Sequence, residues 1–352
     1  MNRCSPLDPG VHLVSDTEDT GGLVKPRALV TGGAGFVGSH LAEALLEDEW
    51  AVEVIDDLST GSRSNIAHLE DRDGFCWTVG SVLDRDVLAR LIERADVVYH
   101  LAAAVGVQLI VDSPIRAIQT NIRGTEMVLE LAARKGARVL ITSTSEVYGK
   151  GGGRALREDD DSVLGPTSRS RWCYATSNMI DEFLTLGYVR ECGLSATVVR
   201  LFSTIGPRQS GRYGMVVPRF VTQAIAGRPI TVYGDGTQRR SFTWVGDIVR
   251  ALTALVHHPA AVGEVFNVGH TSDISIGELA RLVKSLTGSP SEIVFIPFDE
   301  AYGRDFEDVP RSLPDIAKLQ RLVGYQPTLE LPEMVRRIVE HHRGAAPGRA
   351  VA

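Results

Sequence analysis

A glycine-rich turn at residues 30–38, Val-Thr-Gly-Gly-Ala-Gly-Phe-Val-Gly, constrains the fold of this chain more than any other feature. An apolar run precedes it, and a stretch with helical spacing follows at residues 39–49. The turn has glycines at three-residue spacing: Gly32, Gly35 and Gly38. Glycine allows a tight turn and lets a pyrophosphate approach the free N–H groups at a helix N-terminus. The sequence therefore predicts a dinucleotide-binding turn between a buried strand and a helix.

A second apolar run, residues 50–57, ends in the acidic pair Asp56 and Asp57. A carboxylate at this strand end can accept a hydrogen bond from an adenosine ribose hydroxyl and would repel a 2′-phosphate. The pattern favours NAD over NADP as the cofactor. Capping of the turn by the two aspartates is the alternative interpretation.

Helical segments and apolar runs alternate as far as residue 203. The expected helices are 86–95, 124–136 and 179–193, and the expected strands are 96–103, 137–145 and 195–203. Alternation of this kind, with continuous apolar strands, is typical of a parallel sheet covered by helices on both faces. The fold class predicted is α/β, a Rossmann-type doubly wound parallel sheet with a smaller C-terminal α+β lobe.

The texture of the chain changes after Gly206, where glycine, proline, arginine and aromatic residues become frequent. We expect a nucleotide-binding domain over residues 26–205. A substrate lobe follows over 206–342, with some elements returning to the first domain. Residues 1–25 and 343–352 are predicted to be flexible extensions.

Composition excludes several classes of function. The net charge is −7, without the basic face that nucleic-acid binding requires. No apolar run reaches the length of a membrane span, and the N-terminus lacks the pattern of a signal peptide. Four cysteines without CxxC spacing predict reduced thiols and no metal site. We therefore expect a cytoplasmic enzyme that binds neither nucleic acid nor membranes.

Several ordered motifs together resemble the extended short-chain dehydrogenase/reductases, and within them the NAD-dependent nucleotide-sugar epimerase/dehydratase family. The resemblance covers roughly residues 26–340. The motifs are TGGAGFVGSHLAEALL, VEVIDDLSTG, HLAA, TNIRGTEMVLELA, STSEVYG, RWCYATSN, GPRQSGRYGMVVPRF, VYGDGTQRRSF and EVFNVG. The resemblance implies NAD as cofactor, a UDP-sugar or another NDP-sugar as substrate, and a homodimer.

The resemblance also implies roles for single residues. The expected cofactor-binding residues are Gly32, Gly35, Phe36, Val37, Gly38, Asp56, Asp57, Ser81, Val82, Leu101, Ala102, Ala103, Asn121, Tyr174 and Asn178. The expected catalytic residues are Thr144, Ser145, Glu146, Tyr174 and Asn178. The expected substrate-binding residues are Ser203, Arg212, Val217, Arg240 and Arg311. In this mechanism Tyr174 removes the proton of the sugar C4 hydroxyl while NAD accepts the hydride.

One departure from the family pattern bears directly on catalysis. The Tyr-x-x-x-Lys motif reads Tyr174-Ala175-Thr176-Ser177-Asn178, so an amide stands where the family has a lysine. A lysine about 4 Å from the phenolate, at an effective dielectric of about 20, would stabilise it by about 4 kcal/mol. Asparagine supplies hydrogen bonds but no charge. Lys150 and Arg171 are the nearest cations along the sequence.

Three explanations of Asn178 stay open: a natural paralogue with weak or altered activity, a non-catalytic nucleotide-sugar binder, and a deliberate inactivating substitution. Two further departures are milder. Ser203 stands where the family usually has asparagine, and Gly80-Ser81-Val82 lacks an aspartate that contacts adenine.

The triplet Thr144-Ser145-Glu146 discriminates among reactions of the family. Classical dehydration is disfavoured because Ser145 replaces an acidic residue. The triplet followed by Val-Tyr-Gly resembles UDP-glucuronate decarboxylases, whereas the second lobe resembles UDP-glucose 4-epimerases. 4-Epimerisation is the first expectation, because it is the commonest activity in the group that the chain resembles. Decarboxylation and an inactive binding homologue are the alternatives.

Overall fold

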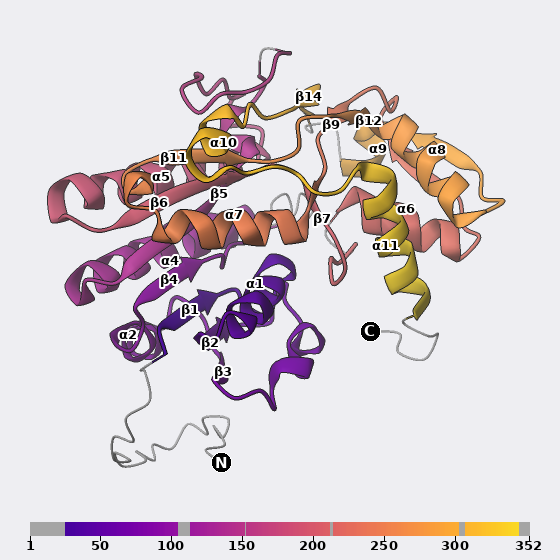
Figure 1. The fold of residues 1–352 in the computed structure, drawn as a ribbon. Coiled ribbons are helices and arrows are strands. Elements are labelled where there is room, and N and C mark those ends of the chain that lie inside the picture. Colours follow the sequence, from indigo (N-terminus) through magenta and orange to yellow (C-terminus); the bar gives the residue numbers. More distant parts are fainter. Residues whose placement is uncertain (1–24, 105–112, 152, 212–213, 303–306, 345–352) are drawn as a thin grey trace.

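The computed structural model describes residues 25–104, 113–151, 153–211, 214–302 and 307–344. Its centre is a seven-stranded sheet in the order β11-β6-β5-β4-β1-β2-β3, and every pair of neighbours in it is parallel (Figure 1). The strands are β1 Arg27–Thr31, β2 Ala51–Asp56, β3 Phe75–Val79, β4 Val97–His100, β5 Arg138–Thr144, β6 Ala196–Leu201 and β11 Val265–Val268. The predicted fold class, an α/β doubly wound parallel sheet, is confirmed.

The order in which strands are added to the sheet changes direction between β1 and β4, although the strands themselves stay parallel. From β1 the order proceeds through β2 to β3 on one side, and from β4 through β5 and β6 on the other. Thr31 at the end of β1 pairs with Ile55 of β2 and His100 of β4, so the three carboxyl ends lie together. Such a switch point leaves a crevice above the strand ends, where open α/β sheets bind their ligands.

Helices cover both faces of the sheet, as the continuous apolar strands require. Apolar residues of α1 and α7 form the core on one face, and those of α2 and α4 form the core on the other, where α5 packs along α4. These helices are α1 Phe36–Glu47, α2 Arg85–Glu93, α4 Pro114–Lys135, α5 Trp172–Cys192 and α7 Val245–His257.

A second lobe is built around its own apolar core, to which α6, α8 and α11 contribute. Its helices are α6 Val216–Ile225, α8 Ile276–Thr287, α9 Phe298–Tyr302 and α11 Leu331–Gly344. Its short strands are β8 Ile230–Tyr233, β9 Arg239–Arg240, β12 Ile274–Ser275, β13 Ile293–Ile296 and β14 Arg311–Ser312. Between the lobes β7 Thr204–Ile205 pairs with β10 Thr243–Trp244. Two later elements, β11 and α10 Ala317–Val323, pack with the first lobe.

Two helices begin earlier than their sequence patterns predict. The helix expected at 124–136 begins at Pro114, and the helix expected at 179–193 begins at Trp172. Proline is favourable in the first helical turn, because N–H groups at that position have no partner within the helix and proline therefore loses no hydrogen bond. Since α5 begins at Trp172, Tyr174 and Asn178 lie one turn apart on the same helix.

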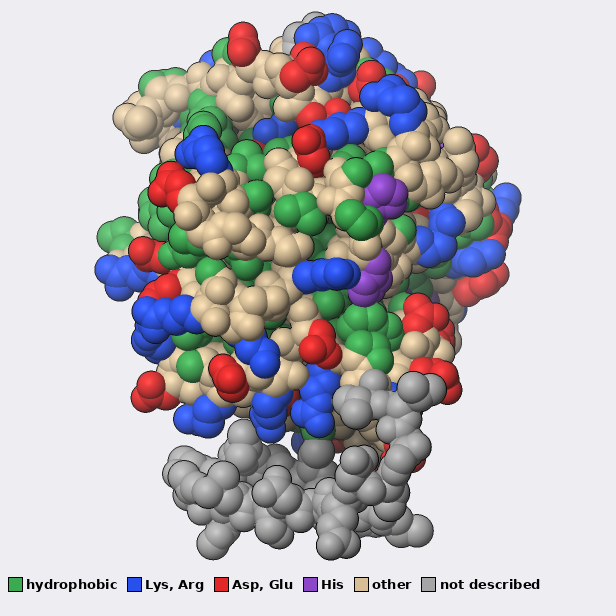
Figure 2. Space-filling model, turned by 60° about the vertical axis from the view of Figure 1, so that its left-hand side comes forward, with side chains coloured by type: hydrophobic (Ala, Val, Ile, Leu, Met, Phe, Trp, Pro, Cys, Tyr) green, Lys and Arg blue, Asp and Glu red, His purple; other side chains and the backbone are tan. Residues whose placement is uncertain are grey.

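The structure also bears on the expectations for the cysteines, the chain ends and the surface. Cys76 of β3 is disulfide-bonded, whereas Cys173 and Cys192 are free. The expectation of reduced thiols is therefore wrong for Cys76, because spacing along the chain does not reveal which residues meet in space. Most of the expected flexible extensions, 1–25 and 343–352, lies outside the described residues. No helix within the described ranges is long and apolar enough to cross a membrane. Basic and acidic side chains are interspersed over the face shown in Figure 2.

Candidate active site

The glycine turn brings the backbones of β1 and β4 into direct contact. Gly32 has a positive φ of 69°, and its N–H donates to the Ile55 carbonyl at 2.8 Å. A Cβ at Gly32 would lie 2.8 Å from the Ala102 nitrogen, and one at Gly38 would overlap the Gly32 carbonyl. The first turn of α1 follows, and its N-cap, Gly35, has no side chain to cap it. These residues fit a dinucleotide pyrophosphate, which would take the place of a cap.

Asp56 closes one side of this turn. Its carboxylate accepts hydrogen bonds from the backbone N–H groups of Ala34, at 3.0 Å, and Leu58, at 2.8 Å. Burial raises the pKa of the Asp56 carboxyl, although these hydrogen bonds oppose the shift. Asp56 also lines the cavity above the strand ends. The structure thus gives it the turn-capping contacts of the alternative interpretation and leaves it within reach of a ligand.

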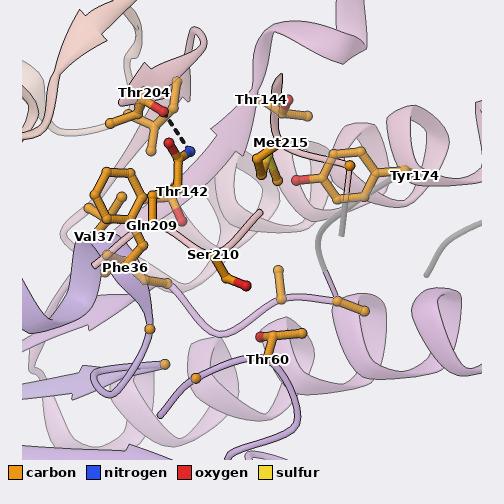
Figure 3. A pocket seen from close by; sticks show the side chains of 18 of the residues that line it. Phe36, Val37, Thr60, Thr142, Thr144, Tyr174, Thr204, Gln209, Ser210 and Met215 are labelled. Atoms are coloured by element: carbon orange, nitrogen blue, oxygen red, sulfur yellow. Dashed lines mark hydrogen bonds between the residues drawn. The ribbon is translucent and has the colours of Figure 1, made fainter. Parts of the chain in front are cut away.

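A cavity of about 900 Å³ extends from the glycine turn to the second lobe (Figure 3). Most of the predicted site residues line it. They are Gly32, Gly35, Phe36, Val37, Gly38, Asp56, Asp57, Ser81, Val82, Leu101, Ala102, Ala103, Thr144, Ser145, Glu146, Tyr174, Ser203, Val217 and Arg240. The cavity is therefore shared between the carboxyl ends of the parallel strands and the smaller lobe.

Tyr174 points into the middle of this cavity from the first turn of α5. Figure 3 shows its hydroxyl group directed toward Met215, with Thr144 nearby at the end of β5. Burial and the negative charge of Glu146 raise the pKa of Tyr174, while hydrogen bonding with Thr144 and Asn178 opposes that rise. The surroundings thus favour the neutral phenol of Tyr174 over the phenolate, and only the phenolate is an effective base.

An ion-pair network holds Glu146 at the edge of the cavity. The buried Arg171 guanidinium donates to the Glu146 carboxylate at 2.8 Å and to the Asp308 carboxylate at 3.0 Å. Arg240 donates to the same Asp308 oxygen at 2.7 Å. Burial opposes the charge on Arg171, but the two carboxylates outweigh it and raise its pKa. The network joins the short helical turn Ser145–Tyr148, the N-cap of α5 and two segments of the second lobe.

Three predicted residues do not line the cavity. Asn121 on α4 accepts from the Ala104 N–H at 2.9 Å and donates to the Ser177 hydroxyl at 3.0 Å. Asn178 is 3% exposed, and its Nδ2 donates to the Tyr174 carbonyl at 2.9 Å. In the structure both amides make contacts that hold the cavity walls.

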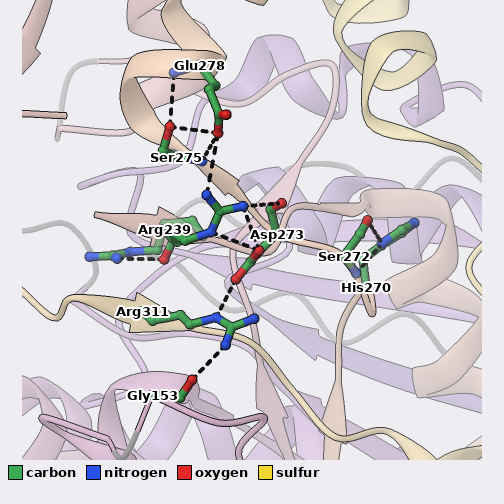
Figure 4. A network of polar contacts seen from close by, with 9 residues as sticks. Gly153, Arg239, His270, Ser272, Asp273, Ser275, Glu278 and Arg311 are labelled. Atoms are coloured by element: carbon green, nitrogen blue, oxygen red, sulfur yellow. Dashed lines mark hydrogen bonds and ion pairs between the residues drawn. The ribbon is translucent and has the colours of Figure 1, made fainter. Parts of the chain in front are cut away.

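Arg311 is the third of these. Its guanidinium pairs with Asp273 and donates to the Gly153 carbonyl at 2.6 Å, while Arg239 pairs with Asp273 from the other side (Figure 4). Its substrate contact stays a prediction. Arg212 lies outside the described residues, and its role also stays a prediction.

The sequence interpretation missed several cavity residues. Arg219 lies over the Tyr233 ring at 3.8 Å from its centroid, and Tyr302 meets Tyr233 edge to face at 5.2 Å. Arg208, with a positive φ of 67°, crosses between the lobes and pairs with Glu43 of α1 at 2.6 Å. The motifs that contain Arg208 and Arg219 are visible in the sequence, but their partners lie far away along the chain.

Neither cation considered for the place of the missing lysine is free to act. Lys150 pairs with Glu307 at 3.4 Å, and Arg171 is already held by Glu146 and Asp308. Within the described part of the chain the cavity lining includes five arginines and no lysine: Arg116, Arg171, Arg208, Arg219 and Arg240.

Comparison with known proteins agrees with this architecture. Residues 28–269 match the model of the NAD dependent epimerase/dehydratase family. A UDP-N-acetyl-alpha-D-glucosaminuronate decarboxylase of Bacillus cytotoxicus is 39% identical over 91% of this chain and 98% of its own length. UDP-glucuronic acid decarboxylase 1 of Xenopus tropicalis is 37% identical over 95% of this chain and 75% of its own length.

Solved structures give the same family. UDP-glucose 4-epimerase of Thermotoga maritima, with UDP-glucose, superimposes with a TM-score of 0.82 at 30% identity, covering 91% of this chain and 99% of its own. UDP-glucuronic acid 4-epimerase of Bacillus cereus, with UDP-glucuronic acid and NAD, has a TM-score of 0.82 at 29% identity and the same coverage. The fold and site define a nucleotide-binding enzyme of the α/β class. The chain belongs to the NAD-dependent epimerase/dehydratase family, whose cofactor is NAD.

The contact at Gly32 predicts a specific loss of cofactor binding. Gly32→Ala should weaken NAD binding at least about tenfold, because the new methyl group would meet the Ala102 backbone and a positive φ is strained for alanine. Isothermal titration of the NAD-free protein measures this. Gly136→Ala is the matched control, since Gly136 has φ 76° but nothing within 4 Å. It should cost about 1–2 kcal/mol of stability, because alanine is strained at a positive φ, and leave NAD affinity unchanged. Equal NAD affinities for the two variants would contradict the prediction.

Proposed function

We propose that the chain decarboxylates a UDP-linked uronic acid through transient oxidation at C4. The observation that carries this proposal is the uncharged Ser145 beside a Glu146 that Arg171 fixes at the cavity edge, next to Tyr174. Elimination of water needs an acid at the reacting carbons, and serine is a poor one. Loss of CO2 needs only a neighbouring ketone and an oriented carboxylate. The sequence relatives named as UDP-uronate decarboxylases support decarboxylation over our first expectation, which was 4-epimerisation.

The residues of this chain divide the work as follows. Tyr174 removes the proton of the C4 hydroxyl, and Thr144 hydrogen-bonds the same oxygen. Bound NAD supplies the reversible hydride acceptor. The resulting 4-keto sugar is a β-keto acid, so the C5–C6 bond breaks to CO2 and an enolate. C5 then takes up a proton. Reduction of the C4 ketone, with Tyr174 returning its proton to the C4 oxygen, gives the UDP-pentose. The apolar Met215 beside Tyr174 reduces the hydration of the carboxylate and favours its loss.

Epimerisation at C4 is the second candidate. It uses the same tyrosine, threonine and cofactor and needs room for the ketone to present its other face. Structural similarity to UDP-glucose and UDP-glucuronic acid 4-epimerases favours it. A third candidate, a binding protein without turnover, is favoured by the neutral Asn178 and the high pKa of Tyr174.

Incubation with four UDP-sugars separates the three candidates. We expect CO2 and a UDP-pentose from UDP-glucuronate or UDP-N-acetylglucosaminuronate, and no product from UDP-glucose or UDP-N-acetylglucosamine, as measured by chromatography and mass spectrometry. Tyr174→Phe should abolish turnover while NAD remains bound, because only the proton acceptor is lost. A 4-epimer without CO2 would overturn the proposal in favour of epimerisation. Absence of both product and bound NADH would favour the binding protein.

We further propose that the chain is a homodimer that associates through α4 and α5. Four apolar side chains on these helices face solvent in the isolated chain: Ile115, Ile118, Ile180 and Phe183. Phe183 and Ile115 are each 72% exposed. Apolar exposure of this kind, gathered on two packed helices, is typical of a protein interface.

Phe183→Asp should convert the dimer to a monomer, because a buried charge without a partner opposes association. Light scattering after size exclusion measures the mass. Phe295→Asp on β13 is the control, since Phe295 is also exposed but lies on the second lobe. A wild-type monomer, or dissociation caused by both variants, would contradict this interface.

A further inference from the structure

A buried carboxyl group lies one helical turn from Asn178. Asp181 follows it at i+3 on α5, so the two side chains occupy neighbouring positions on one face. Asn178 is 3% and Asp181 5% exposed. One carboxylate oxygen of Asp181, Oδ1, has no hydrogen-bond partner. Because Asn178 replaces the lysine and Asp181 is an acid, this part of α5 lacks the positive charge that the Tyr-x-x-x-Lys motif brings.

The charged groups around Asp181 do not supply one. Glu182, the next residue, is negative, and its own charge is met by Arg200 at 2.7 Å and by the Ser143 hydroxyl. Tyr174 and the Asp181 carboxyl are close enough for a negative charge on Asp181 to raise the tyrosine pKa. Asp181 forms no ion pair with any residue that the structure describes. A buried carboxylate with no cation beside it is costly, and protonation removes that cost.

A chain of hydrogen bonds leads from the cavity wall to Thr125, whose side chain acts on the pKa of the Asp181 carboxyl. The Thr31 hydroxyl accepts from the Ala102 N–H at 3.2 Å and contacts His100 Nδ1 at 2.8 Å. His100 Nε2 lies 3.2 Å from the Thr125 hydroxyl, and hydrogen bonding by Thr125 lowers the pKa of the Asp181 carboxyl. Complete burial lowers the pKa of His100 to about 4, so the ring is neutral. With the proton of His100 on Nε2, every group donates toward the next as far as the Thr125 hydroxyl.

We propose that Asp181 keeps its proton in the folded protein up to neutral pH, and that the neutral pair Asn178 and Asp181 takes the place of the lysine as a pH-responsive group beside Tyr174. Asp181 is thus a positioning residue that acts through Tyr174. It does not touch the substrate. Burial raises the pKa of its carboxyl to about 7, with Thr125 opposing and Glu182 adding to the shift.

The proposal fixes the sign of a pH effect on stability. Below about pH 4 Asp181 is protonated in both the folded and the unfolded chain. Between about pH 4 and 7 the unfolded chain has released this proton and the folded chain has not, so stability falls as pH rises. Above about pH 7 the loss is complete. The histidines with lowered pKa, His40 and His100, act in the opposite direction, so a difference between variants is needed.

Thermal unfolding of the NAD-free full chain from pH 5 to 8 gives that difference. Asp181→Asn mimics the protonated acid, so its Tm should exceed that of the wild type by several degrees at pH 8 and by less at pH 5. Glu182→Gln is the matched control: it is equally buried on the same helix, and it should lower the Tm because it leaves Arg200 without its carboxylate. Parallel pH curves for Asp181→Asn and the wild type would overturn the proposal.

Infrared spectroscopy of the wild type provides a test without any variant. A protonated acid has a carbonyl stretch that a carboxylate lacks. A buried carbonyl band that disappears with a midpoint near pH 7 supports the assignment, and a featureless region at pH 6 refutes it.

The pairing also predicts that Asn178→Lys alone restores little. The new ammonium group would pair with Asp181 and draw off its proton, so the net charge near Tyr174 would barely change. Asn178→Lys/Asp181→Asn leaves the ammonium group unpaired, and its turnover should exceed that of the single variant at least about tenfold, one pKa unit of Tyr174.

Turnover rests on the proposed function, whereas the Tm series does not. Asn178→Lys should therefore also flatten the pH dependence of the Tm, since its Asp181 is ionised throughout. Equal turnover of the single and double variants, or an unchanged pH slope in Asn178→Lys, would contradict the pairing. Loss of all turnover with the expected pH slopes would count against the proposed function alone.

Discussion

The close approach of Gly32 to Ala102 is the constraint on which the site depends. At this point two parallel strands end side by side, and the missing Cβ lets their backbones touch. Gly32 also donates to Ile55, so one residue ties together the ends of β1, β2 and β4. A longer side chain would separate the strands, widen the crevice and displace the first turn of α1. Backbone packing therefore sets the shape of the cofactor cavity, and the strand ends hold the polar side chains that face it.

Ion pairs between charged side chains connect the second lobe with the first lobe at the site. Asp308 accepts from both Arg171 of the first lobe and Arg240 of the second, so one carboxylate holds two guanidinium groups across the cavity. Arg208 makes the reverse connection, from the loop after β7 to Glu43 of α1. These contacts are largely shielded from solvent, and removing one partner would leave a buried charge uncompensated. The geometry near Tyr174 thus depends on the lobes staying together, and closure around a nucleotide sugar would act on the same ion pairs.

Sequence reasoning reached the first lobe because its signals are local. The glycine turn, the first two apolar strands and Asp56 all lie within 30 residues of one another, and the local pattern predicts their structure. Arg171 and Asp308 are brought together by the fold across more than a hundred residues, and no local pattern announces such a pair. Residue type was also a poor guide to orientation. Asn121 turns to Ser177 and Arg311 to Asp273, because a nearby polar group in the same lobe satisfies each of them.

Asn178 shows why a departure from a motif must be judged with its neighbours. Taken alone, the loss of a lysine predicts a tyrosine that ionises too reluctantly to act as a base. The structure adds a buried acid one turn away, whose charge would have cancelled that of a lysine. Loss of the lysine's positive charge and protonation of Asp181 offset each other, so the net charge of the buried site stays nearly unchanged, whereas either change alone would disturb it. The neutral amide and the proton-holding acid therefore form one unit, and the base strength of Tyr174 follows the protonation of its neighbour.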